Sequence, residues 1–273
     1  MTVQDPFPAP LTPTVRSARR RFASLRVIGA LMLREMTTGY GSSPGGYVWA
    51  VLEPALGIAL LTTIFSLGFK SPAIGINFPI FYATGMVPFL MFMDLTGKMS
   101  SSLNFSKALL AYPTVSFVDA MIARFIVNAL TQLMVAYLIL GGILLAFETR
   151  TILDLPVIAT ALAMSMALAI GVGTVNCFLF TAFPIWQRAW GIATRPLFLV
   201  SCVIFPYDPI PQPYKDWLWY NPLVQIVGWM RHGFYPSYDA PYVSLLYVFG
   251  VALILTLTGL VFLRRYHRDL LQN

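Results

Sequence analysis

The chain has 273 residues, of which 58% are hydrophobic and only 11% are charged, and its mean hydropathy is +0.72. Soluble domains carry roughly 45–50% apolar and about 25% charged residues, and disordered chains are polar and highly charged, so this composition excludes both classes. The net charge is +7, but the basic residues cluster beside apolar stretches, which favours contact with anionic lipid over nucleic-acid binding.

The N-terminal region divides into a tail and a helix. Residues 1–15 hold four prolines and no apolar core, which predicts a disordered cytoplasmic tail without a cleavable signal peptide. Residues 16–38 are too polar to span a membrane, and their apolar residues share one side of a helical wheel, which predicts an amphipathic helix in the membrane interface. A solvated basic arm is the alternative. The residues chosen to represent this interface helix are Arg20, Phe22, Arg26 and Arg34.

Six apolar stretches follow, and about 20 apolar residues suffice for a helix to cross a bilayer. The fifth is the weakest because Arg195 and Pro196 interrupt it. The pattern predicts an all-α polytopic membrane protein with a six-helix transmembrane domain over residues 47–265. The expected spans are residues 47–69, 78–97, 118–147, 155–183, 189–205 and 242–263.

The distribution of lysine and arginine predicts the orientation of these spans. With the N-terminus in the cytoplasm, 13 basic residues lie inside and four lie outside, and Arg124 falls within a helix. Cytoplasmic loops carry the excess of basic residues in membrane proteins, so we expect both termini in the cytoplasm. That arrangement requires an even number of spans, which supports counting the fifth.

Two connections are informative. The inner connection, residues 98–116, is mildly amphipathic, and either a short helix facing a cytosolic partner or a plain loop fits it. The outer connection, residues 206–241, holds seven prolines and many aromatic residues, as membrane interfaces do. We expect short re-entrant or interfacial helices there, with one half-membrane helix between Leu223 and Phe234. A surface loop with an aromatic belt is the alternative.

The sequence lacks two common motifs, one nucleotide-binding and one metal-binding, and one acidic residue stands out within a span. No Gly-x-x-x-x-Gly-Lys-Ser/Thr motif and no His-Glu-x-x-His motif occurs in the sequence, so we expect no catalytic residue, no metal and no cofactor in this chain. Glu53 is the acidic residue well inside a span, followed by the helix-bending Pro54. It lines a cytoplasmic entrance or bonds to Arg34 or to the Ser42–Ser43 turn, and the sequence leaves both readings open.

Small residues recur every four positions in the fourth span. Ala159, Ala163, Ala167 and Gly171 form this stripe, which allows two helices to approach closely. We expect it to pack inside the bundle rather than to bind a ligand.

Three segments carry a resemblance to a known family. Residues 34–54 combine an Arg-rich amphipathic helix with Tyr-Gly-Ser-Ser-Pro, Trp49 and Glu53-Pro54, and this resembles the membrane subunit of ABC exporters for capsular polysaccharide. Export permeases for O-antigen and teichoic acid are similar. Trp219-Tyr220-Asn221-Pro222 before Arg231 and Tyr112-Pro113 are further matches. Gly39 departs from the pattern, because relatives often carry Arg or Lys there.

The resemblance implies a homodimer in the bacterial inner membrane and a separate ABC ATPase subunit that holds ATP and magnesium. Its substrate would be a lipid-linked polysaccharide, with periplasmic and outer-membrane export proteins and membrane lipids as further partners. Contact with the ATPase is expected at the N-terminal interface helix and, in the inner connection, at Lys107, Leu109, Leu110, Tyr112 and Pro113. The expected channel residues are Tyr47, Trp49, Glu53, Phe198, Phe205 and Tyr207, for each of which a lipid-facing position is the alternative.

Other functions compete with this one. An ABC exporter of a drug or small lipid would share the fold. An intramembrane enzyme acting on lipid-linked glycans would need paired acidic residues near a membrane face, for which only the regions of Glu53, Asp94 and Asp119 are candidates. A secondary transporter would often show internal repeats and charged residues at mid-membrane. The sequence does not identify the glycan or its lipid anchor.

Overall fold

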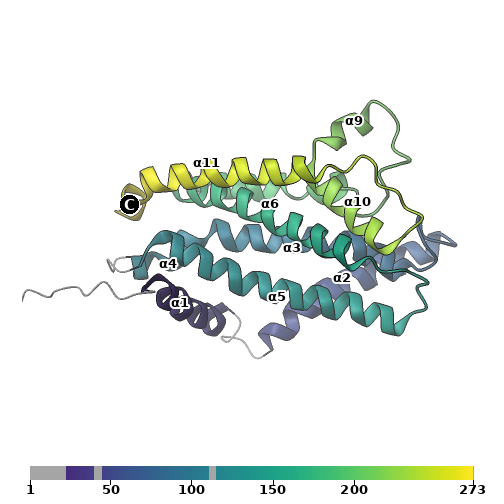
Figure 1. Ribbon diagram of the computed structural model, residues 1–273, viewed down its shortest axis with the longest axis horizontal. Coiled ribbons are helices and arrows are strands. Elements are labelled where there is room, and N and C mark those ends of the chain that lie inside the picture. The colour runs from purple at the N-terminus through teal and green to yellow at the C-terminus, as the bar shows by residue number, and fades with distance from the viewer. Residues whose placement is uncertain (1–22, 40–44, 111–114, 273) are drawn as a thin grey trace, which may run out of the picture.

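The structure is a computed structural model and describes residues 23–39, 45–110 and 115–272 (Figure 1). Over these residues the chain is helical and contains no strand. The predicted tail, the first part of the interface helix with Arg20 and Phe22, and Tyr112-Pro113 lie outside this part of the chain. The helices are α1 (Ala23–Gly39), α2 (Gly46–Gly68), α3 (Phe78–Ser100), α4 (Ser102–Leu110), α5 (Phe117–Ala146), α6 (Leu155–Ala182), α7 (Pro184–Ala193), α8 (Leu197–Val200), α9 (Tyr214–Trp219), α10 (Pro222–Phe234) and α11 (Leu245–Gln272).

Five described helices are long and apolar enough to cross a membrane by length and composition, namely α2, α3, α5, α6 and α11. They confirm the polytopic all-α class. Helix α3 lies at the centre, and all its residues from Ile80 to Phe89 are buried. Helix α2 lies at the edge and buries only Ile58. It is therefore the least embedded of the five.

The bundle has two distinct ends. Helix α4 and the last turns of α11 lie at one end, which we call the inner end, and α9 and α10 lie at the other, outer end (Figure 1). Helices α6 and α11 run in the same direction, because Gly171 packs on Ala252 and Gly259 packs on Thr174. The chain must therefore return along the bundle between the end of α6 and the start of α11.

The structure corrects the expected fifth span. Helix α7 ends at Ala193, and α8 covers only Leu197–Val200. Pro196 lies between them, and a proline inside a helix lacks an N–H and clashes with the carbonyl four residues earlier. The fifth expected span, residues 189–205, is therefore broken at the predicted interruption into two short helices, neither of which is long enough to span a membrane.

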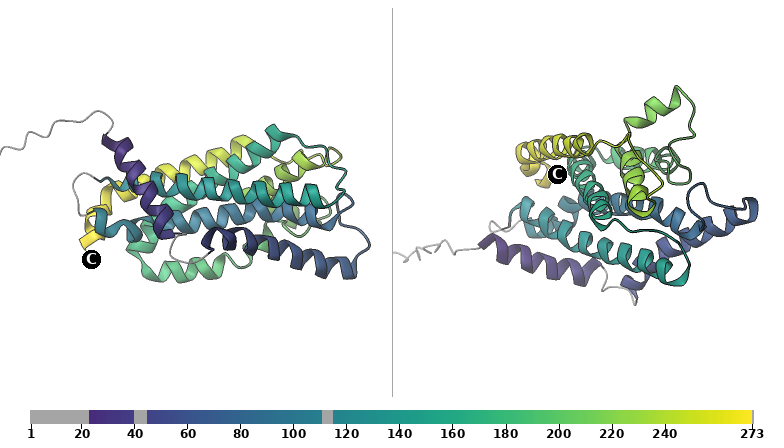
Figure 2. Two further views of the ribbon diagram at one scale, coloured as in Figure 1. Left: turned by 90° about the horizontal axis from the view of Figure 1, so that it is seen from below. Right: turned by 45° about the vertical axis from the view of Figure 1, so that its right-hand side comes forward.

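Helices α7 and α8 nevertheless carry the chain from the inner to the outer end (Figure 2). The indole nitrogen of Trp186 in α7 donates a hydrogen bond of 3.0 Å to Asn176, near the inner end of α6. The ring of Phe198 in α8 packs edge-on against Phe89 of α3, and Val203 then lies beside Gly85, one turn nearer the outer start of α3. The fifth crossing is therefore interrupted rather than absent.

The half-membrane helix predicted in the outer connection is α10. Its 13 residues span about 20 Å, which is too short to cross a bilayer. The Asn221 side chain caps it by accepting the Leu223 N–H at 3.1 Å, and Pro222 occupies the first helical position, where a missing N–H costs nothing. Helix α10 packs on α3 and α6, so most of its residues are buried.

Glycines allow α6 and α11 to pack closely. A Cβ on Gly259 would lie 2.7 Å from the Thr174 carbonyl carbon and 2.7 Å from the Val175 nitrogen, both backbone atoms of α6. The Gly171 end of the small-residue stripe makes the same kind of contact with the Ala252 carbonyl. The structure therefore shows close helix packing at this end of the stripe.

We expect Gly259→Ala and Gly250→Ala to change stability in opposite directions. The first substitution forces two backbones apart and should lower the free energy of unfolding by about 1–3 kcal/mol, as overpacking does. Gly250, on the same helix, has no atom within 4 Å of its added Cβ, so alanine should stabilise by about 0.4–1 kcal/mol. Detergent-induced unfolding of both purified variants measures the difference, and equal effects would contradict the close packing.

Candidate functional site

A cavity of about 860 Å³ lies between the first turns of α2, the inner half of α3 and the middle of α5. Trp49 and Glu53, one turn apart on α2, both line it. Residues three or four apart share one face of a helix, so this face of α2 points into the cavity. The remaining lining residues are Gly39, Gly46, Ala50, Pro54, Gly57, Met86, Leu90, Met93, Asp94, Lys98 and Gln132.

The cavity is polar at its inner side and apolar farther along α3. Asp94 and Lys98 project from α3, and the Asp94 carboxylate accepts a hydrogen bond of 2.9 Å from the Gln132 amide of α5. The Glu53 carboxylate forms no ion pair with any residue that the structure describes. The cavity thus offers an aromatic face, two carboxylates and an ammonium group.

This arrangement suits a ligand rich in hydroxyl groups. Carboxylate and amide oxygens accept hydrogen bonds from hydroxyls, and an aromatic face packs against C–H groups. The Arg34 guanidinium donates a hydrogen bond to the Phe105 carbonyl, and the Ser42–Ser43 turn lies outside the described residues, so an entrance role for Glu53 stays a prediction.

The other four residues expected to line a channel lie elsewhere. Tyr47 is exposed on α2 and does not line the cavity. Phe198 packs against Phe89, and Phe205 lies in the outer segment that follows α8. Tyr207 is buried, and its hydroxyl donates a hydrogen bond of 2.9 Å to the Lys215 carbonyl. The structure therefore brings together only Trp49 and Glu53 of this set, and a channel role for the others stays a prediction.

The inner connection contains a helix, α4, rather than a plain loop. Its Lys107 is exposed, and Leu109 is half-buried. Leu110 is the last residue of α4, and Tyr112 and Pro113 lie outside the described residues. Contact of this segment with a second protein stays a prediction.

Helix α1 packs along α5 at the inner end and has two different faces. Leu25, Leu33 and Met36 are exposed apolar residues, as expected for a helix at a lipid surface. Arg26 is also exposed, whereas Arg34 contacts α4, where it donates a hydrogen bond of 3.3 Å to the Phe105 carbonyl. One face of α1 therefore contacts the bundle, and the other is free to meet lipid.

The outer segment is fixed by a buried arginine that the sequence analysis did not single out as buried. Arg231 of α10 donates hydrogen bonds of 2.7 Å to the Val203 carbonyl and 3.0 Å to the Phe205 carbonyl. Its guanidinium also lies 4.6 Å from the centre of the Phe81 ring of α3. It therefore ties the segment after α8 to two helices at once.

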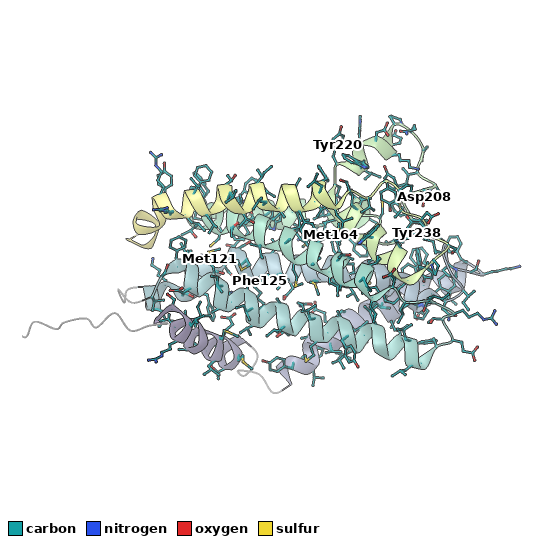
Figure 3. All side chains as sticks on the ribbon, viewed as in Figure 1. Met121, Phe125, Met164, Asp208, Tyr220 and Tyr238 are labelled. Carbon is teal, nitrogen blue, oxygen red and sulfur yellow. The ribbon has the colours of Figure 1, made fainter. Side chains whose placement is uncertain are left out.

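Tyrosines surround this outer region, and Figure 3 shows Tyr238, Asp208 and Tyr220 around α9 and α10. The Tyr238 and Tyr242 hydroxyls lie 3.0 Å apart, and the Tyr238 carbonyl lies 2.8 Å from His232 Nδ1. Burial raises the pKa of Tyr238 to about 12, so the hydroxyl stays neutral at physiological pH. The outer segment thus combines hydrogen bonds of neutral tyrosine hydroxyls with one buried cation, Arg231.

Sequence reasoning did not place the α3 and α5 residues in one cavity with Trp49 and Glu53. Asp94 and Gln132 are 38 positions apart, and no local pattern indicates that they pair. Their polarity could have indicated the site, because Asp94 and Gln132 lie within apolar stretches and Lys98 lies at the end of one. Such residues in spans face protein or water and often mark pathways.

Comparisons with known proteins identify relatives over nearly the whole chain. Residues 26–235 match the family model described as ABC-2 type transporter. The polysialic acid transport protein KpsM of Escherichia coli is 30% identical over 257 residues, which cover 94% of this chain and 100% of that protein. The capsule polysaccharide export inner-membrane protein CtrC of Neisseria meningitidis serogroup B is 24% identical, over 89% of this chain and 92% of that protein. The capsule polysaccharide export inner-membrane protein BexB of Haemophilus influenzae is 21% identical, over 90% of this chain and 92% of that protein.

Proposed function

This chain belongs to the ABC-2 type transporter family, and from that membership we propose that it is the membrane subunit of an ATP-driven exporter. The proposed substrate is a lipid-linked capsular polysaccharide that crosses the cytoplasmic membrane. The observation that carries the proposal is the similarity to KpsM over the full length of that transport protein. The family resemblance found in residues 34–54 is confirmed by the same comparisons.

The cavity beside α2 supports a carbohydrate substrate. Trp49 supplies an aromatic face for the C–H side of a sugar ring, and Glu53, Asp94 and Gln132 supply groups that bond to hydroxyls. The expected partners are a separate ABC ATPase, which would hold ATP and magnesium, and a second copy of this chain. A closed twofold dimer is the commonest oligomer, and one bundle of this size is small for a polymer path.

We place the protein in the bacterial inner membrane with both termini in the cytoplasm, because 13 basic residues then lie inside and four outside. A Ser237→Cys variant should accordingly react with an impermeant thiol reagent added from the periplasmic side. Ser237 is exposed beyond α10, and the two native cysteines are buried, so the introduced thiol is the reactive one. Labelling from the cytoplasmic side alone would contradict the orientation.

ATP-dependent glycan movement tests the proposed function directly. The chain and its ATPase are reconstituted in vesicles whose ATPase side faces outward, and lipid-linked glycan is added to the membrane. We expect ATP to move the glycan into the lumen, where an added glycosidase cannot digest it. Equal movement of a short-chain phospholipid or a drug would favour the competing exporter function, and absence of any movement would contradict the proposal.

The same assay tests the cavity. Glu53→Gln removes a charged hydrogen-bond acceptor, which costs roughly 1.5–3 kcal/mol per bond, so export should fall about tenfold or more. Leu67→Ala is the matched control, because Leu67 lies on the same helix, is 86% exposed and does not line the cavity. Equal export by both variants would remove Glu53 from the path.

A further inference from the structure

A buried ionic cluster lies next to the cavity and joins α1 to α5. Arg124 Nη1 of α5 lies 3.6 Å from Glu35 Oε2 of α1, and both side chains are less than a tenth exposed. The Asn128 amide, one turn along α5, donates a hydrogen bond of 3.3 Å to the other carboxylate oxygen of Glu35. It donates a second hydrogen bond, of 2.7 Å, to the Arg124 carbonyl. One carboxylate of α1 is thus held by two side chains of α5.

Arg124 also contacts α4. Its guanidinium carbon lies 4.1 Å from the centre of the Phe105 ring. Its Nη2 donates a hydrogen bond of 3.3 Å to the hydroxyl of Ser101, the residue that caps the C-terminus of α3. Arg34 of α1 approaches the same ring at 4.8 Å and donates to the Phe105 carbonyl. Phe105 is therefore held by two arginines, one from α5 and one from α1, and this set of contacts is called the Arg124 cluster below.

The cluster resists separation of its helices. Breaking a buried ion pair by removing one partner is unfavourable, because the remaining charge stays buried. Cation–π contact with Phe105 adds to this, more for the buried Arg124 than for the half-buried Arg34. Helices α1, α4 and α5 therefore tend to move together at the inner end.

The cluster lies one helical turn from the cavity on each of three elements. Gly39 follows Glu35 by four residues on α1, and Gln132 follows Asn128 by four residues on α5. Lys98 precedes Ser101 by three residues at the end of α3. Residues three or four apart share a helix face, so a shift of the cluster displaces the cavity wall.

Helix α4 presents its opposite side to solvent. Asn104 and Lys107, three residues apart, are both exposed, whereas Phe105 points into the cluster. A protein that pushes on the exposed side of α4 would therefore act on Arg124 through Phe105.

We propose that Arg124 is a positioning residue that links α4 to the width of the cavity through Phe105 and Glu35. This inference rests on the proposed function, because it takes the ATPase as the protein that moves α4. In that setting, nucleotide-driven displacement of α4 changes the cavity through one buried cation.

The first experiment measures coupling in the complete complex with its ATPase, reconstituted in nanodiscs. Arg124→Gln should leave complex assembly and basal ATP hydrolysis within twofold of wild type, while stimulation of hydrolysis by lipid-linked glycan is lost. Arg124→Lys keeps the charge beside Glu35 but lacks the planar group that stacks on Phe105, so we expect partial stimulation. Arg150→Gln is the control for charge removal, because Arg150 is exposed in the outer α5–α6 connection.

The second experiment does not depend on transport. Spin labels at Leu33→Cys on α1 and Asn104→Cys on α4 report the distance between these helices in the chain without nucleotide or glycan. Both positions are exposed, and the native Cys177 and Cys202 are buried. We expect one narrow distance distribution, which broadens when Arg124→Gln is added and not when Arg150→Gln is added.

These readouts separate the inference from the function. An unchanged distribution in Arg124→Gln overturns the link even if the wild-type complex exports glycan. Full glycan stimulation in Arg124→Gln overturns it as well. If the wild-type complex exports no glycan, the proposed function fails, and the distance measurement still decides whether Arg124 holds α1 to α4.

Discussion

Replacing Leu109 and Leu110 together by aspartate is expected to stop glycan export while the chain still inserts and folds. Both residues end α4, outside the helices long enough to span, so the substitution leaves the membrane core intact. If this segment contacts the ATPase, each new carboxylate is buried without a partner, at a cost of roughly 3–5 kcal/mol. A loss of that size weakens association by more than about 100-fold. Co-purification of the ATPase and vesicle export measure the two consequences.

The matched control adds the same two charges at the other end of the bundle. Ile152→Asp with Leu153→Asp changes an adjacent apolar pair that is exposed in the α5–α6 connection. We expect this control to bind its ATPase and to export as wild type. Normal export by the α4 variant would exclude α4 as the ATPase contact, and equal loss in both variants would point to misfolding rather than to a contact.

The sequence predicted the long helices well because their signal is local. About 20 consecutive apolar residues can only be accommodated in a membrane or a large core, and the five long helices coincide with five of the six expected stretches. Helix α10 was also predictable, because Asn221-Pro222 is a helix start signal and a proline-rich connection limits its length. The sequence did not show how far Pro196 shortens the fifth crossing, because tertiary packing decides whether a proline kinks a helix or ends it.

The candidate site was predictable only on one helix. Trp49 and Glu53 lie one turn apart, so a helical wheel places them on one face, and the structure shows both in one cavity. The opposite wall comes from α3 and α5, whose polar residues meet only after folding. The Glu35–Asn128 contact joins residues 93 positions apart, and a single sequence carries no signal for such a pair.

The same limit applies at the outer end, where Arg231 is one of the four basic residues that the charge count places outside. Its position in the sequence indicates an exposed loop charge, whereas the structure buries it almost completely. Charge counting predicts orientation from the side of the membrane on which a basic residue lies and not from its exposure. It does not predict which charge holds the structure together.

Substituting Arg231 by methionine is expected to release the segment after α8. Methionine has a similar length but no donor, so the Val203 and Phe205 carbonyls lose the hydrogen bonds that they accept. Each buried carbonyl left unsatisfied costs about 1–3 kcal/mol, and loss of the contact with Phe81 adds to this. Removing a buried charge offsets part of the cost, and we expect a net loss of about 2–4 kcal/mol of unfolding free energy.

Arg231→Lys distinguishes the charge from its geometry. Lysine keeps the cation, but its compact ammonium group cannot reproduce the planar fork that reaches two carbonyls and faces the Phe81 ring. We expect its unfolding free energy to lie between those of wild type and Arg231→Met. Arg150→Met, at an exposed position, should stay within about 0.5 kcal/mol of wild type.

The two native cysteines report where the damage occurs. Cys202 precedes Val203 and is buried with Tyr207 and Val224 at the outer end, whereas Cys177 is buried in a separate cluster at the inner end. If Arg231 holds the segment locally, Arg231→Met should make Cys202 react with a membrane-permeant maleimide while Cys177 stays protected, as resolved by peptide mass spectrometry. Equal labelling of both cysteines would indicate global unfolding, and protection of both would show that Arg231 is dispensable for the outer segment.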